Sequence, residues 1–334
     1  MKRLAILIGL SSLSLAALPG SARAQAPVPL ALTEWEVPWA DTRPRDPYVA
    51  PDGSIWFVGQ TGHYVARFDP KTAGFERIAL EDGAGPHNLI VDNSGTIWYA
   101  GNRQAHIGKV NPATGAIQKF ATPADQLRDP HTLVFDRDGN IWFTAQGSGN
   151  VGHLNVTTGQ VRVATVPTER SRPYGIVLDQ AGRPWFNEFG SNKIATVDPQ
   201  TLAVREYVLP NERSRTRRLV VASDGGVWYV DYTRGFVGRL DPRSGSVEEY
   251  AAPSAATSLP YALVVDDKDR LWFVETGIRP NQFVGFDTRT RKFIGTTPIK
   301  SGGGAVRHMV FDAPTRSIWF GTDAGTIGRA VVPE

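Results

Sequence analysis

The chain has 334 residues, with 36 Lys or Arg against 33 Asp or Glu, and it contains no cysteine. The absence of cysteine excludes disulfide bonds, a catalytic thiol, thiolate-bound zinc and cysteine-held iron–sulfur clusters. A hydrophobic share of 41% and a charged share of 21% are typical of a globular protein.

The first 24 residues resemble a secretory signal peptide. Lys2 and Arg3 precede an apolar stretch over residues 4–18, and Ala22 and Ala24 are the small residues that favour cleavage after Ala24. We therefore predict export by the general secretory route, to the periplasm or outside the cell, with no membrane insertion after cleavage. An uncleaved membrane anchor is the alternative interpretation of the same stretch.

The charge balance changes when the leader is removed. Residues 1–24 contain Lys2, Arg3 and Arg23 and no acidic residue, so the net charge falls from +3 to zero. A protein that binds nucleic acid usually carries a surplus of basic residues, so we expect no nucleic-acid partner.

A tryptophan followed by Phe or Tyr recurs along the chain at spacings of 42 to 47 residues. The seven copies are Trp56, Trp98, Trp142, Trp185, Trp228, Trp272 and Trp319. Their rings are expected to pack between sheets, because each repeat has one. The second copy shows the pattern of the unit, with short apolar segments at residues 88–92, 96–100, 106–110 and 116–121, separated by Asn, Gly and Pro turns.

Four short strands in a unit of about 43 residues predict an all-β fold, a seven-bladed β-propeller with four antiparallel strands per blade. A long β-helix or a sandwich is the competing architecture. The last copy ends after its third segment, at residues 326–332, and residues 32–38 match the fourth-strand pattern of residues 204–210. We predict that this N-terminal strand completes the last blade and that residues 25–334 form one domain.

The repeats differ most at two positions that the propeller places near its central channel. The first lies eleven residues before each tryptophan, or twelve in the last copy, and holds ligand-handling side chains: Arg45, His87, His131, Tyr174, Arg217, Tyr261 and Arg307. The second lies three residues after each tryptophan and carries the carboxylates Glu188, Asp231 and Glu275 in three neighbouring blades. We expect the two positions to form cross-strand pairs on one face of the sheet.

These side chains have two interpretations. They can form a small-molecule site, with Tyr261, His131 or His87 transferring a proton, Arg217, Arg45, Tyr174 and Arg307 binding substrate, and Glu275, Asp231 and Glu188 holding Mg²⁺. Alternatively, the two positions only supply each other's hydrogen-bond partners and opposite charges, without binding a ligand, in the pairs Arg217–Asp231, Tyr174–Glu188 and Tyr261–Glu275. The remaining histidines, His63, His106, His153 and His308, fit surface or packing roles.

The loops that precede the blades are rich in arginine. Seven residues form this predicted collar: Arg43, Arg128, Arg170, Arg172, Arg213, Arg215 and Arg218. On a chain without net charge, such a collar would steer a carboxylate or phosphate ligand toward the channel. We accordingly expect a small, anionic ligand and a monomeric protein.

The repeated phrase of proline, His or Tyr, a short apolar strand, Asp, a turn and Trp-Phe resembles the streptogramin B lyases, also called virginiamycin B lyases. Pro86-His87, Pro130-His131, Pro173-Tyr174 and Pro260-Tyr261 carry the phrase, together with Trp272-Phe273-Val274-Glu275. The resemblance implies a seven-bladed propeller and a C–O lyase that opens the ester of a cyclic depsipeptide antibiotic by elimination. A histidine base and Mg²⁺ held by two glutamates belong to that implied chemistry.

The chain keeps one of the four residues that the resemblance implies. Glu275 stands at one metal position, whereas Leu259 stands at the other, Tyr261 replaces the histidine base, and Arg217 replaces a substrate-contacting histidine. The sequence therefore supports two hypotheses, a lyase-like enzyme for an ester- or lactone-bearing ligand and a non-catalytic binding propeller for an anionic ligand or a protein partner. A lactone hydrolase on a calcium-binding propeller would share the fold, but its set of acidic and Asn ligands is not evident.

Overall fold

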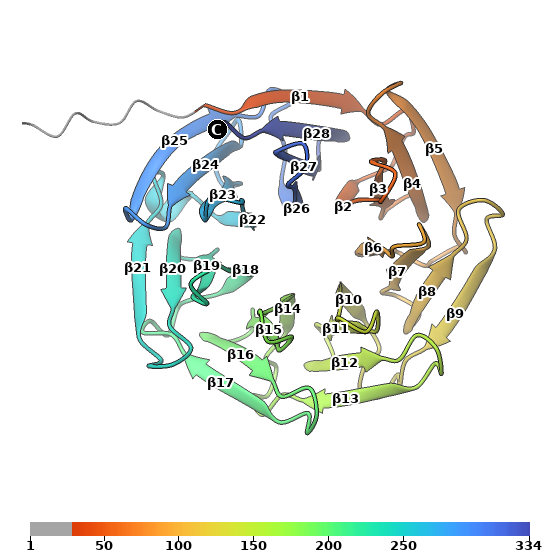
Figure 1. The fold of residues 1–334 in the computed structure, drawn as a ribbon, viewed down its shortest axis with the longest axis horizontal. Coiled ribbons are helices and arrows are strands. Elements are labelled where there is room, and N and C mark those ends of the chain that lie inside the picture. The colour runs from red at the N-terminus through yellow and green to blue at the C-terminus, as the bar shows by residue number, and fades with distance from the viewer. Residues whose placement is uncertain (1–28) are drawn as a thin grey trace, which may run out of the picture.

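A computed structural model describes residues 29–334, so the predicted signal peptide and its cleavage site lie outside the described residues. Seven four-stranded antiparallel sheets stand around a central opening, which confirms the predicted propeller (Figure 1). No helix within residues 29–334 is long and apolar enough to cross a membrane. A single short 3₁₀ turn, η1 (Ala255–Thr257), is described between two blades.

Each blade begins with an inner strand beside the central opening (Figure 1). The inner strands are β2 (Pro44–Val49), β6 (Leu89–Val91), β10 (Pro130–Phe135), β14 (Pro173–Leu178), β18 (Thr216–Val221), β22 (Pro260–Val265) and β26 (Val306–Asp312). The second strands carry the repeated tryptophans and are β3 (Ile55–Gly59), β7 (Ile97–Gly101), β11 (Ile141–Ala145), β15 (Pro184–Glu188), β19 (Val227–Asp231), β23 (Arg270–Glu275) and β27 (Ser317–Thr322).

The third and fourth strands form the outer half of each blade. The third strands are β4 (Tyr64–Asp69), β8 (His106–Val110), β12 (Asn150–Leu154), β16 (Lys193–Val197), β20 (Phe236–Leu240), β24 (Gln282–Asp287) and β28 (Thr326–Val331). The fourth strands of the first six blades are β5 (Gly74–Ala79), β9 (Ile117–Ala121), β13 (Val161–Thr165), β17 (Val204–Val208), β21 (Val247–Ala251) and β25 (Lys292–Pro298).

The N-terminal strand β1 (Ala31–Glu36) closes the ring, as the sequence predicts. It pairs antiparallel with β28, in a sheet of order β1-β28-β27-β26. Trp35 lies in this strand, stacked on Trp319 at 5.9 Å and 4.9 Å from Phe68 of the first blade. The two ends of the chain are therefore joined by backbone hydrogen bonds and by aromatic packing.

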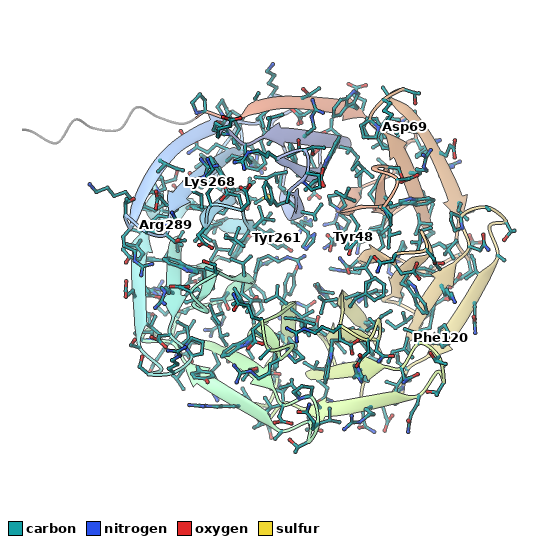
Figure 2. All side chains as sticks on the ribbon, in the orientation of Figure 1. Tyr48, Asp69, Phe120, Tyr261, Lys268 and Arg289 are labelled. Atoms are coloured by element: carbon teal, nitrogen blue, oxygen red, sulfur yellow. The ribbon has the colours of Figure 1, made fainter. Side chains whose placement is uncertain are left out.

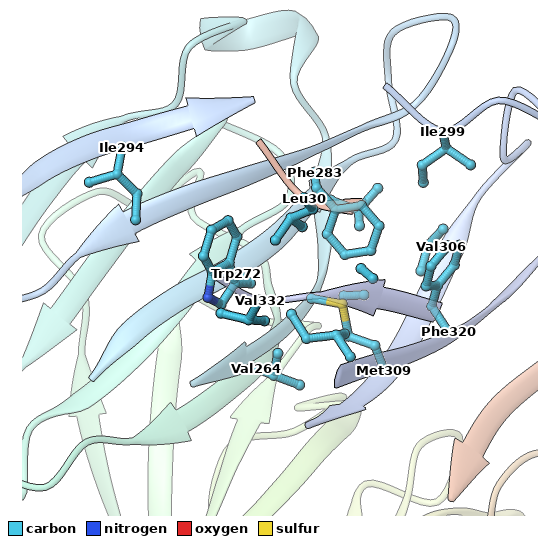
Figure 3. Packing of buried hydrophobic residues seen from close by; sticks show 14 residues of the cluster. Leu30, Val264, Trp272, Phe283, Ile294, Ile299, Val306, Met309, Phe320 and Val332 are labelled. Atoms are coloured by element: carbon cyan, nitrogen blue, oxygen red, sulfur yellow. The ribbon is translucent and has the colours of Figure 1, made fainter. Parts of the chain in front are cut away.

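The repeated tryptophans pack between neighbouring blades, which confirms their predicted role. Trp272 lies in a cluster with Met309 and Phe320 of the next blade and with Leu30 of the N-terminal segment (Figure 3). Several of the indoles are also anchored by the turn before them, because Asp92, Asp179 and Asp266 each accept a 3.0 Å hydrogen bond from the indole nitrogen of their own blade. One aspartate thus fixes both the inner hairpin and the interblade side chain.

Replacing Trp35 tests the closure of the ring. We expect W35A to lower the free energy of unfolding by roughly 2–3 kcal/mol, because a half-buried indole leaves its contacts with Phe68 and Trp319. Urea denaturation measures this loss. The control V208A changes a side chain that is 65% exposed and should alter stability by less than about 0.5 kcal/mol. Equal stability of the two variants would contradict closure by Trp35.

Candidate functional site

The seven predicted channel residues lie at or just before the start of the inner strands and form a ring at one end of the channel. Contacts run from blade to blade, with the rings of His87 and His131 3.5 Å apart and those of His131 and Tyr174 4.2 Å apart. Tyr261 continues the series, because its hydroxyl contacts that of Tyr174 and the Arg307 guanidinium lies 5.6 Å from its ring. Figure 2 shows Tyr261 and Tyr48 at the inner edge of the blades.

The predicted cross-strand pairing is wrong by one residue. Glu188 lies opposite Pro173 and Glu275 opposite Pro260, while the register shifts just after these prolines. A β-bulge therefore sits where Tyr174 and Tyr261 stand. It separates the ring side chains from the carboxylates, so the pairs Tyr174–Glu188 and Tyr261–Glu275 are not formed.

The three carboxylates instead bind groups of the loops around them. Glu275 accepts hydrogen bonds from the backbone N–H and hydroxyl of Ser254, at 2.9 and 2.6 Å, and from Gln282 at 2.6 Å. Asp231 accepts from the backbone N–H of Arg215 at 3.1 Å and lies 3.4 Å from the Arg234 guanidinium. The predicted pair Arg217–Asp231 is consequently absent from the ion pairs of residues 29–334.

Glu188 is fully buried and has one hydrogen bond, a 2.8 Å bond from the Ser191 hydroxyl. Burial raises the pKa of Glu188 and the nearby carboxylate of Glu206 raises it further, while Ser191 and Lys193 lower it, leaving a pKa of about 8. Glu188 is therefore a neutral acid at pH 7.

These residues do not fit the Mg²⁺ site that the family resemblance implies. The part of the chain that the structure describes holds no group of three or more His, Cys, Asp or Glu side chains able to bind a metal ion. Leu259 offers no side-chain ligand, and Glu275 is already bound to Ser254 and Gln282.

The Arg217 guanidinium lies among four aromatic rings, which we call the Arg217 cage. Its central carbon is 4.0 Å from the ring centre of Tyr232, 4.2 Å from Phe189, 4.4 Å from Tyr261 and 5.4 Å from Tyr174. Cation–π contact stabilises the charge in this place. Within residues 29–334 the guanidinium makes no hydrogen bond or ion pair, and its Nε is buried without a partner. The guanidinium of Arg217 therefore keeps unused hydrogen-bond donors.

Phe189 and Tyr232 were not among the predicted site residues. Each directly follows a carboxylate position, after Glu188 and Asp231, and leaves the sheet at the end of a second strand. An aromatic residue four positions after the tryptophan is the sequence signal that identifies them.

Tyr174 and Tyr261, which we call the tyrosine pair, have pKa values that differ from the ordinary value of 10.0 in opposite directions. Burial raises the pKa of Tyr261, but the guanidiniums of Arg217, Arg45, Arg307 and Arg218 lower it more, to about 8. Burial and the charge of its partner raise the pKa of Tyr174 to about 12. Because the two hydroxyls touch, we read this as one pair that loses its first proton near pH 8 and its second near pH 12.

The two ring histidines remain neutral. Burial lowers the pKa of His87 and His131 well below the ordinary value of 6.5, and Arg45 and Arg218 lower it further. His87 directs Nδ1 to the carbonyl of His131 at 3.2 Å, and His131 has its Nδ1 2.9 Å from the Thr132 hydroxyl. The Nε2 atom of His131 is buried without a hydrogen bond. Such low basicity makes both weaker candidates for a base than Tyr261.

A second layer of polar groups lies directly below the ring. Asp46 is fully buried between Arg45, whose Nε is 3.2 Å away, and Arg218, whose Nη2 is 3.4 Å away. Burial raises the pKa of Asp46, but the two arginines, His308 and Asn88 hold it far below its ordinary value. The sequence prediction missed Asp46, which counting one residue beyond the ring position would have revealed.

Six of the seven arginines of the predicted collar are exposed or half-buried, whereas Arg218 is buried and does not belong to the collar. Arg43, Arg128, Arg170, Arg172 and Arg213 are exposed and Arg215 is half-buried. Arg218 belongs to strand β18 instead and is 3% exposed, because the bulge after Thr216 turns its side chain into the channel. Its charge therefore acts on the buried groups and not on the rim.

Fold and site together define a seven-bladed propeller with an arginine- and tyrosine-lined site at one mouth of its channel. The sequence matches the Virginiamycin B lyase family over residues 30–330, so the chain belongs to that family. A search of curated proteins finds no match.

Solved structures support the fold. Virginiamycin B lyase from Staphylococcus aureus is 22% identical with a TM-score of 0.82, over 91% of this chain and 100% of that one. A catalytically inactive variant of the lyase with quinupristin gives 23% identity and a TM-score of 0.82, over 91% and 100%. Hydrazine synthase of Kuenenia stuttgartiensis is 13% identical with a TM-score of 0.72, over 89% and 97%. These likenesses show the propeller fold and not the reaction.

The raised pKa of Glu188 predicts a pH-dependent stability. Because the folded protein holds the proton more tightly than the unfolded chain, its stabilising effect is full below pH 4.5 and is lost as pH rises to about 8. We expect E188Q to escape this loss, so the melting temperature of E188Q minus that of the wild type should increase from pH 5 to 8. The control E169Q, on an exposed loop, should show no such trend, and a constant E188Q difference would contradict the assignment.

Proposed function

We propose that this chain is an exported, lyase-like propeller that binds a small anionic molecule at the Arg217 cage and uses Tyr261 to move a proton. The observation that carries the proposal is the Arg217 guanidinium, which lies 4.4 Å from the Tyr261 ring and has no carboxylate partner within residues 29–334. A guanidinium without a counterion, partly open to solvent, favours a ligand carboxylate.

The chemistry follows from the same arrangement. With a pKa of about 8, the tyrosine pair is about one-tenth ionised at pH 7 and half ionised at pH 8. A Tyr261 phenolate can take a proton from the carbon beside a carbonyl group. The electron pair then forms a double bond between this carbon and the next one, as the alkyl C–O bond of the ester on that next carbon breaks, and the ester oxygen departs as part of a carboxylate. Arg217 and Arg307 stabilise the developing negative charge.

The substrate class is therefore an ester or lactone with an acidic C–H and an anionic group. Quinupristin, the compound found with the inactive virginiamycin B lyase, supplies an ester-bearing probe. The departures at Leu259, Tyr261 and Arg217 favour a related substrate of the anionic class over the cyclic depsipeptide itself.

Non-catalytic binding of an anionic ligand or a protein partner is the second candidate. It is favoured by the loop contacts of Glu275, which occupy the one family metal position that the chain retains. In this case the cage would bind the anion without turnover. The same residue, Arg217, would carry affinity, so the two candidates differ only in what Tyr261 does.

The tyrosine pair can be titrated directly. We expect the absorbance of tyrosinate at 295 nm to show one group ionising near pH 8 in the wild type and not in Y261F. R217M should raise this midpoint toward the ordinary value of 10.0, because it removes the nearest positive charge. Y232F keeps its ring and leaves the tyrosine pair intact, so it serves as control. An unchanged midpoint in R217M would contradict the role of Arg217.

Binding and turnover separate the candidates. We expect malonate, a small and strongly polar dianion, to bind the wild type in calorimetry at least tenfold more tightly than R217M, about 1.4 kcal/mol, while the rim variant R213M binds as the wild type. If the protein is a lyase, it should open the ring of quinupristin or cleave a carboxylate-bearing ester. The rate of this reaction should rise with pH through about 8, be unchanged by a chelator and be lost in Y261F. Malonate binding without any turnover would favour the non-catalytic candidate, and equal malonate binding by R217M would overturn the site.

A further inference from the structure

The half of the channel beyond the Asp46 layer forms a second pocket. The inner strands of all seven blades enclose a cavity of about 400 Å³ that is separate from the Arg217 cage. Its walls are aliphatic and aromatic, and the half-buried lining side chains include Tyr48, Val134, Val177, Val265, Val310 and Phe311. Pockets of this volume with apolar walls are typical of small-molecule sites.

Polar side chains close the inner end of this pocket, and most of their bonding capacity is used. Asn88 donates to Asp46 at 3.0 Å and accepts from the backbone N–H of Leu133 at 2.9 Å. Thr132 accepts from Arg218 at 3.2 Å. These groups fix the floor of the pocket and offer little to a ligand.

Arg218 keeps capacity for a further acceptor. Its Nε donates to the carbonyl of Arg307 at 3.0 Å, one Nη donates to Thr132, and the other donates to Asp46 at 3.4 Å. A guanidinium has five N–H donors, so two of them remain. Positive charges also outnumber negative charges here, because the two guanidiniums of Arg45 and Arg218 share the single carboxylate of Asp46. The floor therefore carries a positive surplus that favours an anion.

His308 contributes the remaining polar group. The sequence analysis placed it in a surface or packing role, but it lines the channel pocket and its Nδ1 is buried without a hydrogen bond. Burial, together with Arg218 and Arg45, lowers the pKa of His308 to about 3, so the ring is neutral and has one N–H to donate.

We propose that this pocket binds an apolar carboxylic acid, with the carboxylate against Arg218 and His308 and the hydrocarbon body along the apolar walls. The proposal goes beyond the Arg217 cage, because the pocket shares no lining residue with the cage and a different guanidinium, that of Arg218, receives the carboxylate. Burial of the hydrocarbon supplies most of the affinity, and the positive floor selects the acid over its neutral analogue.

Octanoate and 1-octanol, which share their hydrocarbon chain, test this assignment by titration calorimetry on the folded protein. We expect octanoate to bind the wild type at least tenfold more tightly than octanol. V177F and V134F each place a larger side chain on a half-buried wall residue, and both should weaken octanoate at least tenfold. V208F makes the same change on an exposed outer strand and should bind as the wild type.

Two variants locate the carboxylate. H308L should weaken octanoate several-fold, because the free N–H is lost while the charge is unchanged. R217M should bind octanoate as the wild type, because Arg217 does not line this pocket. The proposal is overturned if octanoate fails to bind at millimolar concentration, if octanol binds equally well, if V177F and V134F both bind as the wild type, or if R217M abolishes binding.

Discussion

Interblade packing of the repeated tryptophans is the constraint on which the rest of the structure depends. A single four-stranded sheet cannot bury both of its faces, so each blade is stable only against its neighbours. Trp272 packs on Met309 and Phe320 of the following blade, and Trp319 packs on Phe68 of the first. The ring therefore has to close, and the pairing of β1 with β28 closes it.

Closure also brings charged side chains together at the channel. Seven inner strands converge there, so residues 172 positions apart, such as Asp46 and Arg218, come into contact. The bulges near the start of these strands turn the ring residues into the channel and leave Glu188, Asp231 and Glu275 to the loops. The result is a channel in which Arg45, Arg217 and Arg218 outnumber the buried acid Asp46, while Arg307 is paired with Asp323.

The sequence predicts the fold well because its signals are local and repeated. The period of the tryptophans gives the number of blades, and the second repeat places its four strands to within about a residue, for example at His106–Val110. The closing strand is predicted because residues 32–38 share the pattern of a fourth strand. These inferences need only the spacing and the alternation of residues.

The site is less predictable, because it depends on a register that repeats do not encode. A bulge of one residue changes the partner of Glu188 from Tyr174 to Pro173, and no composition signal marks it. The Arg217 cage likewise joins β18 to the loops that carry Phe189 and Tyr232. The identities of the seven ring residues were found by counting, whereas what each one contacts required the three-dimensional arrangement.

The departures from the family pattern act together through charge. Leu259 removes a carboxylate, and Arg217 adds a permanent positive charge beside Tyr261. Both changes make the channel mouth less favourable for a cation and more favourable for an anion. The same arginines stabilise a tyrosinate, so under the proposed function Tyr261 takes the proton that the family resemblance assigns to a histidine base. On that proposal the three departures form one consistent change, from the metal-binding site that the resemblance implies toward a site for an anion.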